Sequence, residues 1–369
     1  KNLREFIIKN SFINKIMNLS ETVKVFENAS INSLILFLSK NEIYKNSKIK
    51  IFSPNVISKS SYLSNPYLLI SKFCTKDLSG LEWHIFKDEK TIEFSSKNII
   101  PLGKIATISP GIQTGCDKVT QTHIDTYHLK NIKKDEGIFV LTDEEYKALN
   151  LTEPEKKYVK PFYKNSAISK WIYNKKNKHW IIITNYIDEL KIYSNLNRHL
   201  LKFKTILDNR YRNFALLNAD KEDKWWYLYG YRPNTNFDNE KIILPYRAVD
   251  NSFAFSHKPF YASIDVFFIN ITDPQFKTKY INCILCSDII EYWLNKNCKR
   301  KGKILELYQK PLSTIPIIKA DKKVQELFSI IFDYILFLLT YQLSDTLELL
   351  LPKYFQQIIN GMVHELYFP

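Results

Sequence analysis

Glycine is scarce in this sequence, with only eight in 369 residues. Two of them, Gly111 and Gly115, nevertheless stand four positions apart within residues 109–118. Glycine is favoured where φ is positive or where the backbone must closely approach another group. An ordinary turn is the simplest interpretation of these ten residues alone. However, Gln113 and Thr114 between the glycines, with a lysine after them, also suit contact with phosphate or with base edges.

Cysteine is also sparse, and its pattern bears on both disulfides and metals. Five scattered cysteines, an odd number, predict no disulfide framework and indicate a reducing, cytoplasmic location. Cys283 and Cys286 are spaced as a metal-binding pair, but no second pair or histidine accompanies them. Zinc takes four ligands, so we interpret the two as buried helix cysteines and expect no metal. The seven histidines show no metal spacing.

Long apolar runs are missing as well. The most apolar run, residues 330–339, contains Asp333 and is shorter than the roughly 20 residues needed to span a bilayer. No signal peptide is visible. We therefore expect a soluble chain without a membrane partner.

Positive charge and aromatic residues are abundant instead. Lys and Arg number 53 against 38 Asp and Glu, which gives a net charge of +15, and there are 23 Tyr, 24 Phe and 6 Trp. A lysine-rich host proteome explains part of the excess. The combination with aromatics favours a nucleic-acid partner, because cations contact phosphates and aromatic rings stack on bases.

The pattern of apolar residues predicts an α/β (mixed α+β) fold. A helix around residues 3–8 precedes a strand at 12–19 and a second, fully buried strand at 31–38. These resemble the edge of a larger sheet. The predicted division is a sheet edge over 1–40, a connecting segment over 41–98, a main α/β domain over 99–320 and C-terminal helices over 321–369.

Within the main α/β domain the expected strands are 180–183, 241–245, 252–255 and 264–270, and the expected helices are 186–211 and 280–295. Two antiparallel helices are expected at the end of the chain, the second broken by Pro352.

The order of several short motifs points to a family. They are Gly111-Ile112-Gln113-Thr114-Gly115, residues 159–168, 207–212, 225–228, 240–247, 260–263 and 312–317. This succession, over about 102–318, resembles the TaqI-like C-terminal specificity domain of adenine-N6 DNA methyltransferases, including type IIG restriction–modification enzymes. Residues 3–36 are similar to the end of that family's methyltransferase domain, and residues 358–369 to its C-terminal helix.

The resemblance implies that the chain gives sequence-specific recognition of double-stranded DNA to a site-specific adenine-N6 methyltransferase that uses S-adenosylmethionine. The family holds its donor in a Gly-rich loop and its target base with an Asn/Asp-Pro-Pro-Tyr/Phe loop. Neither is present, since the sequence has no Pro-Pro dipeptide. The chain begins with Lys1 rather than Met, so we expect a C-terminal piece whose partner is its own missing N-terminal methyltransferase domain. Alone, it is predicted to bind no cofactor and to be inactive.

Phosphate contacts fix the register of a protein on DNA, and long basic side chains supply them. The candidates are Lys118, Lys164, Lys170, Lys299, Arg300, Lys301 and Lys303. A solvated loop is the alternative for the last four, which cluster around a glycine.

Base reading calls for planar or bidentate groups. The candidates are Gln113, Thr114, Arg210, Arg212, Arg232 and Arg247. The alternative for Arg247 is an ion pair at a strand end, with Glu240 or Asp250. For Trp225 and Trp226, stacking on bases competes with burial in the core, and we assign one of the two to the core.

Two other function classes remain open. A specificity subunit of a type I restriction system would dock on separate catalytic subunits, although such subunits usually carry two recognition repeats and one is seen here. An RNA-binding module also fits the charge, but no stacking motif of the common RNA folds occurs. Magnesium nuclease chemistry is not expected.

Overall fold

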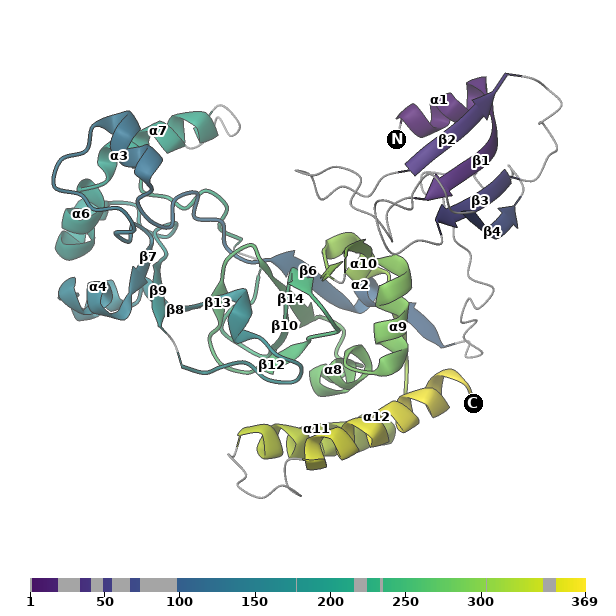
Figure 1. The fold of residues 1–369 in the computed structure, drawn as a ribbon. Coiled ribbons are helices and arrows are strands. Elements are labelled where there is room, and N and C mark those ends of the chain that lie inside the picture. Colours follow the sequence, from purple (N-terminus) through teal and green to yellow (C-terminus); the bar gives the residue numbers. More distant parts are fainter. Residues whose placement is uncertain are drawn as a thin grey trace. The chain divides into compact units, whose positions relative to one another are not determined.

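A computed structural model describes residues 2–18, 34–40, 49–54, 67–73, 98–176, 178–215, 224–232, 235–302, 304–340 and 350–369 (Figure 1). It is a mixed α/β structure with several small sheets, as the sequence predicted, and the described residues form no barrel. The chain divides into two compact units. One comprises Lys1–Phe94 with Lys301–Lys303, and the other comprises Ser95–Arg300 with Ile304–Pro369.

The first unit is a small sheet with one helix. After α1 (Asn2–Asn10), the strands β1 (Phe12–Asn18), β2 (Leu34–Ser39), β3 (Ile49–Pro54) and β4 (Tyr67–Phe73) pair in the order β2-β1-β3-β4. β1 runs antiparallel to β2 and parallel to β3. Its core consists of four buried isoleucines, Ile13, Ile16, Ile49 and Ile51. The predicted helix and first strand are confirmed.

Two expectations about this unit differ from the structure. Residues 41–98 were expected to connect domains, yet they supply β3 and β4 to the sheet. The second expected strand, β2, is not buried on both faces: Leu34, Ile35, Phe37 and Leu38 are each at least 40% exposed. The reason is that β2 lies at the edge of this sheet, where its apolar side chains have few described neighbours.

The second unit contains two four-stranded sheets that share a core. One has the order β12 (Ala254–Ser256), β10 (Lys241–Pro245), β14 (Val266–Ile271) and β6 (Ala106–Pro110), with every pair antiparallel. The other has the order β13 (Tyr261–Ala262), β8 (Val159–Tyr163), β9 (His179–Ile182) and β7 (Val140–Thr142). Phe268 of the first and Phe162 of the second belong to one cluster of buried side chains. All four predicted strands are present within two residues of their expected bounds.

The two predicted long helices are each broken in the middle. The first is a 3-10 turn (Leu190–Ile192) followed by α6 (Ser194–Leu201) and α7 (Lys204–Ala215). The chain tightens at Phe203, whose amide donates to Leu200 at 3.0 Å, and the tightening buries the Phe203 ring. The second is α8 (Thr278–Leu285) and α9 (Asp288–Asn297), divided by Ser287, whose hydroxyl caps α9.

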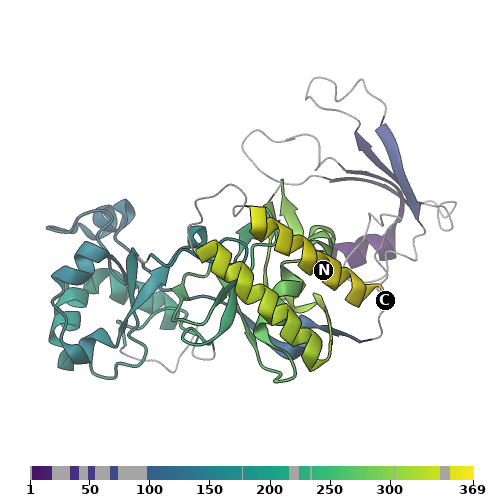
Figure 2. The ribbon, with the colours of Figure 1, turned by 90° about the horizontal axis from the view of Figure 1, so that it is seen from below.

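The chain ends in two helices that run antiparallel and side by side in both views (Figures 1 and 2). They are α11 (Lys322–Thr340) and α12 (Leu351–Tyr367). α11 packs on α8, where Phe328 meets Tyr280 edge-on at 5.3 Å. Pro352 does not break α12, because it occupies the first turn, where a missing N–H costs nothing.

The remaining elements are short and connect the sheets. They are β5 (Ile99–Pro101), α2 (Leu102–Ile105), α3 (Gln121–Tyr127), α4 (Asp143–Ala148), α5 (Glu153–Lys156), a 3-10 turn (Asn165–Ala167), β11 (Arg247–Ala248), β15 (Lys299–Lys301), β16 (Ile304–Glu306), α10 (Gln309–Ser313) and β17 (Pro316–Ile318).

Candidate nucleic-acid interface

Residues 111–118, called the glycine loop below, follow β6 and need each glycine for a different reason. A side chain at Gly111 would place its Cβ 2.4 Å from the carbonyl oxygens of Ala262 and Ser263. The Gly111 amide donates to Val266 at 2.8 Å, so the loop lies directly on the turn that joins β13 to β14. Gly115 has a φ of +76°, which L side chains rarely adopt.

The two polar residues between the glycines, Gln113 and Thr114, form hydrogen bonds that hold the loop in shape. Gln113 pairs through its backbone with Gly230, with N–O distances of 3.2 and 2.7 Å, and its side chain is half-buried. Thr114 is buried; its hydroxyl donates to Asp117 and accepts from the Cys116 amide at 3.1 Å. Thr114 therefore shapes the loop, whereas Gln113 keeps a side chain available at its surface.

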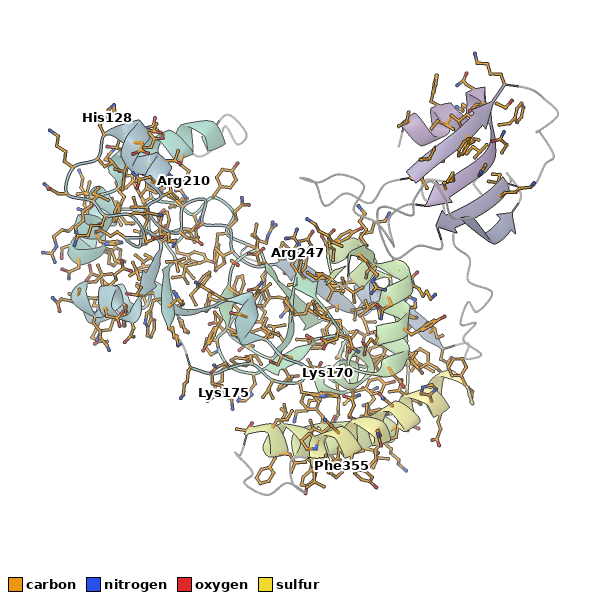
Figure 3. The ribbon with its side chains drawn as sticks, viewed as in Figure 1. His128, Lys170, Lys175, Arg210, Arg247 and Phe355 are labelled. Carbon is orange, nitrogen blue, oxygen red and sulfur yellow. The ribbon has the colours of Figure 1, made fainter. Side chains whose placement is uncertain are left out.

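Arg210 of α7 packs against the glycine loop from inside the protein (its position is labelled in Figure 3). Its guanidinium donates to the carbonyls of Thr114, Trp225 and Tyr227, the last at 2.6 Å, and lies 5.0 Å from the centre of the Phe139 ring. Burial lowers its pKa to about 10. Its two terminal nitrogens already donate to backbone carbonyls, so we no longer count Arg210 among the base-reading candidates.

The glycine loop borders a hollow of about 420 Å³. The other side is formed by Ser263, Ile264 and Asp265, with Thr120 and His123 at one end. Ile264 and Asp265 are exposed. The hollow thus presents backbone groups, two carboxylates and one apolar tip to solvent, a mixture suited to base edges, which carry donors, acceptors and methyl groups.

Lys118 stands at the end of this hollow and forms an ion pair with Asp135. Both side chains are more than half exposed. The hydrogen bond from Lys118 lowers the pKa of Asp135. An exposed ion pair of this kind contributes little to stability, so a phosphate can replace the carboxylate without a large cost.

A basic strand lies beside the same turn. The Asp265 carbonyl accepts from the Tyr246 amide at 2.7 Å, and Arg247 follows in β11. β11 pairs antiparallel with β16, which neighbours β15 in the sheet order β11-β16-β15. Arg247, Lys299 and Arg300 are exposed. Lys118 thus borders the hollow, and Arg247, Lys299 and Arg300 lie on the small sheet that adjoins it at Asp265; we call these four residues the basic rim.

Arg247 forms an ion pair at a strand end, which was the alternative to base reading. Its partner, however, is not one of the two predicted carboxylates. Its Nη2 lies 3.6 Å from Glu306, directly opposite in β16, and neither Glu240 nor Asp250 is involved. The guanidinium also lies over the Tyr246 ring at 5.3 Å. The side chain is still 55% exposed, so this pair does not withdraw Arg247 from the surface.

The other predicted contact residues are mostly exposed. Lys164 is exposed after β8, and Lys170 is half-buried with Glu291 3.8 Å away (Figure 3). Arg232 is exposed after Gly230. Lys301 ends β15 and is exposed. Arg212 lies in α7, but its side chain falls outside the described part, as does the whole of Lys303.

The tryptophan pair packs against the core. Trp226 donates from Nε1 to the Ile187 carbonyl at 3.0 Å, and Trp225 meets it edge-on at 5.7 Å. Lys204 lies 5.1 Å from the centre of the Trp225 ring. Both rings are half-buried, so neither forms an open stacking platform.

Sequence reasoning missed Tyr246, Ser263 and Asp265, which complete the hollow and link it to the basic rim. The only signal for them was their position beside motifs 240–247 and 260–263. Their proximity to the glycine loop depends on β14 pairing with β6, which joins residues about 160 apart in the sequence.

The cysteine pair and the length of the helices bear on metal binding and on membrane insertion. Cys283 in α8 and Cys286 at its end are buried, as predicted, and donate to the Phe328 and Phe253 carbonyls. Among the described residues, no three His, Cys, Asp or Glu side chains are grouped as a metal site would require. No helix in the described ranges is long and apolar enough to cross a membrane.

Residues 190–317 match the model of the TaqI-like C-terminal specificity domain. This confirms the predicted resemblance over that segment. The specificity domain contains Arg247 and β15 of the basic rim, whereas the glycine loop and Lys118 precede it. None of the curated proteins compared with the chain matches it.

One solved structure shows a similar fold over nearly the whole chain. The structure of the type IIL restriction–modification enzyme MmeI in complex with DNA is 14% identical, with a TM-score of 0.60 over 97% of this chain and 43% of that one. The type IIG restriction endonuclease BpuSI is 11% identical, with a TM-score of 0.37 over 99% of this chain and 45% of that one. The chain thus spans less than half the length of these structures.

Proposed function

We propose that this chain recognises a specific sequence in double-stranded DNA for a restriction–modification enzyme. The observation that carries the proposal is the basic rim beside the glycine loop, partly within a segment that matches a specificity domain. The rim would hold phosphates, and Gln113, Ser263 and Asp265 around the hollow would contact base edges. The same fold in MmeI, solved with DNA, supports this assignment.

We further propose that the complete protein is an adenine-N6 methyltransferase, in which the first unit is the end of the methyltransferase sheet. The exposed apolar side chains of β2, together with Leu3 and Phe6 of α1, support this, because an apolar edge strand is normally covered. A separate methyltransferase domain would cover it.

The residues of this chain do not fit S-adenosylmethionine. Residues 1–94 contain a single glycine, Gly80, and so cannot form a Gly-rich donor loop. No Pro-Pro dipeptide is present to hold a target base. We therefore assign methyl transfer to the longer protein and DNA recognition to this chain.

Binding of a fluorescently labelled duplex at two salt concentrations tests the proposal. If the basic rim neutralises three phosphates, affinity should fall roughly 40-fold between 50 and 200 mM salt. An affinity that does not change with salt would contradict the proposal.

Paired substitutions then test the rim itself. The double variant Lys299→Gln/Arg300→Gln should lower the slope of log K against log salt by about 2. The matched control is Lys322→Gln/Lys323→Gln, which removes two exposed charges from the start of α11 and should leave the slope unchanged. Equal effects of the two pairs would indicate attraction by net charge alone rather than a defined interface.

A further inference from the structure

A second hollow, also of about 420 Å³, lies at the edge of the sheet formed by β13, β8, β9 and β7. Its volume is within the range of roughly 300–1,000 Å³ that is usual for small-molecule pockets. It is lined by Lys157, Tyr158, Lys160, Ile183, Tyr186, Tyr231, Asp238 and Tyr261. Half of these residues are tyrosines, so we call it the tyrosine pocket.

Three tyrosines of the pocket differ in how far they are exposed to solvent. Tyr186 is 59% exposed, Tyr231 is half-buried and Tyr261 is buried. The Tyr186 hydroxyl donates to that of Tyr231 at 3.2 Å, and their rings meet edge-on at 5.3 Å. Tyr186 is thereby held in place although it is exposed, and it offers an aromatic ring to a flat ligand at low entropic cost.

One carboxylate, that of Asp238, lines the pocket. The Tyr261 hydroxyl bonds both oxygens of Asp238, at 2.9 and 3.0 Å, which fixes the carboxylate. Burial raises the pKa of Tyr231 and of Tyr261, so both phenols stay neutral. Asp238 is exposed and can accept further hydrogen bonds, as from an exocyclic amine.

The charge at the rim decides between two classes of ligand. Aromatic cages with a carboxylate often take organic cations. Here, however, Lys157 lies 4.7 Å from the centre of the Tyr158 ring, and Lys160 is a second ammonium on the rim. Two lysines against one aspartate disfavour a cation. They favour a flat ligand that carries a negative group, as a nucleotide does.

The tyrosine pocket is also adjacent to the glycine-loop hollow. Gly230 pairs with Gln113 of that loop, and the next residue is Tyr231. Likewise, β13 runs from Tyr261 toward Ser263, which lines the first hollow. The same two segments therefore serve both hollows.

We propose that the tyrosine pocket binds one unpaired nucleobase of the DNA, with its ring on Tyr186, its exocyclic amine at Asp238 and its phosphate at Lys157 and Lys160. This rests on the proposed DNA binding. Stacking of a base on an aromatic side chain contributes about 1–3 kcal/mol.

The experiment compares two labelled duplexes by fluorescence anisotropy on the full chain. One is perfectly paired, and the other carries a single extrahelical cytosine, so that no unpairing energy is needed. We expect the extrahelical base to tighten binding about 10-fold. A duplex with an extrahelical thymine, which lacks the amine, should bind about fivefold more weakly than the duplex with an extrahelical cytosine.

Substitutions at the pocket locate the effect. Tyr186→Leu should remove the preference for the extrahelical base and leave affinity for the perfect duplex unchanged, whereas Tyr186→Phe should retain it. Tyr354→Leu on α12 is the matched control, because Tyr354 is 58% exposed. It should change neither affinity.

The outcomes separate this proposal from the one it rests on. Salt-dependent binding of both duplexes with equal affinity would overturn the tyrosine pocket and leave DNA recognition standing. Binding of neither duplex would overturn both. A preference that survives Tyr186→Leu, or that Tyr354→Leu also removes, would place the unpaired base elsewhere.

Discussion

At the scale of single residues, the guanidinium of Arg210 holds the glycine loop in place. It joins three carbonyls from two segments, Thr114 on one side and Trp225 and Tyr227 on the other. A guanidinium can do this because its donors form a rigid, planar fork, and a lysine ammonium cannot. The loop therefore depends on a half-buried charge.

We expect Arg210→Lys to lower the free energy of unfolding by about 2 kcal/mol, because two charge-assisted hydrogen bonds are lost in a buried site. Urea unfolding measures the change. Arg198→Lys is the control, since Arg198 is exposed and bonds only Asn195 among the partners described. It should change stability by less than about 0.5 kcal/mol. Equal losses in the two variants would contradict the bracing role.

Glu155 is a second buried charge, and it makes stability depend on pH. Burial raises the pKa of Glu155, but hydrogen bonds from Thr152, Asn195 and Leu196 outweigh burial and lower the pKa to about 2. The carboxylate caps the amides at the start of α6.

The folded-state pKa of Glu155 is depressed, so its contribution is present above the ordinary value of 4.5 and is lost as pH falls toward 2. We expect Glu155→Gln to cost roughly 3 kcal/mol at pH 7 and much less at pH 3, measured by urea unfolding at both values. Glu153→Gln, which changes an exposed carboxylate in the same helix, should cost little at either pH. If Glu155→Gln lowered stability by the same amount at both pH values, the depressed pKa assigned to Glu155 would be refuted.

At the scale of elements, α11 is part of the core rather than an appendage. Phe332 meets Trp171 at 5.7 Å and Phe255 at 5.3 Å, and these rings come from a loop and from β12. Trp171 also donates to Gln356 of α12 at 3.0 Å. The C-terminal hairpin is therefore held by apolar packing and by specific polar contacts.

Phe332→Ala should lower the free energy of unfolding by about 3–5 kcal/mol, because it leaves a cavity beside the rings of Trp171 and Phe255. Phe337→Ala removes the same ring from the same helix at a position that is 49% exposed, and should cost less than about 1 kcal/mol. Thermal unfolding compares the two. Similar losses would mean that the outer face of α11 is covered as well.

At the scale of the whole molecule, the two compact units have separate cores. The isoleucine cluster of the first unit shares no member with the large cluster of the second. Units with separate cores are free to unfold in separate transitions.

Calorimetry on the full chain should therefore resolve two transitions, a small one for the first unit and a large one for the second. Ile16→Ala should lower only the small transition, and Phe268→Ala only the large one, since both residues are fully buried in their own units. A single transition that shifts with either substitution would show that the units unfold together.

The sequence alone determined four strands of the second unit, β9, β10, β12 and β14; β10 and β14, for example, are nearly continuous apolar runs of strand length. It also determined that Gly111 and Gly115 mark a special loop, since so few glycines occur elsewhere. It did not determine the breaks at Phe203 and Ser287, which arise when a helical pattern is bent to bury more side chains. Periodicity within a segment carries no information about such a bend.

Only the tertiary structure decided which side chains face solvent. Arg210 and Arg247 look alike in sequence, yet one is buried among carbonyls and the other lies on an exposed strand. The tyrosine pocket is likewise assembled from residues 157–261, which no local pattern connects. Secondary structure follows from neighbours in the chain, whereas a binding surface follows from the pairing of distant strands, and that pairing is fixed only when the shared core is packed.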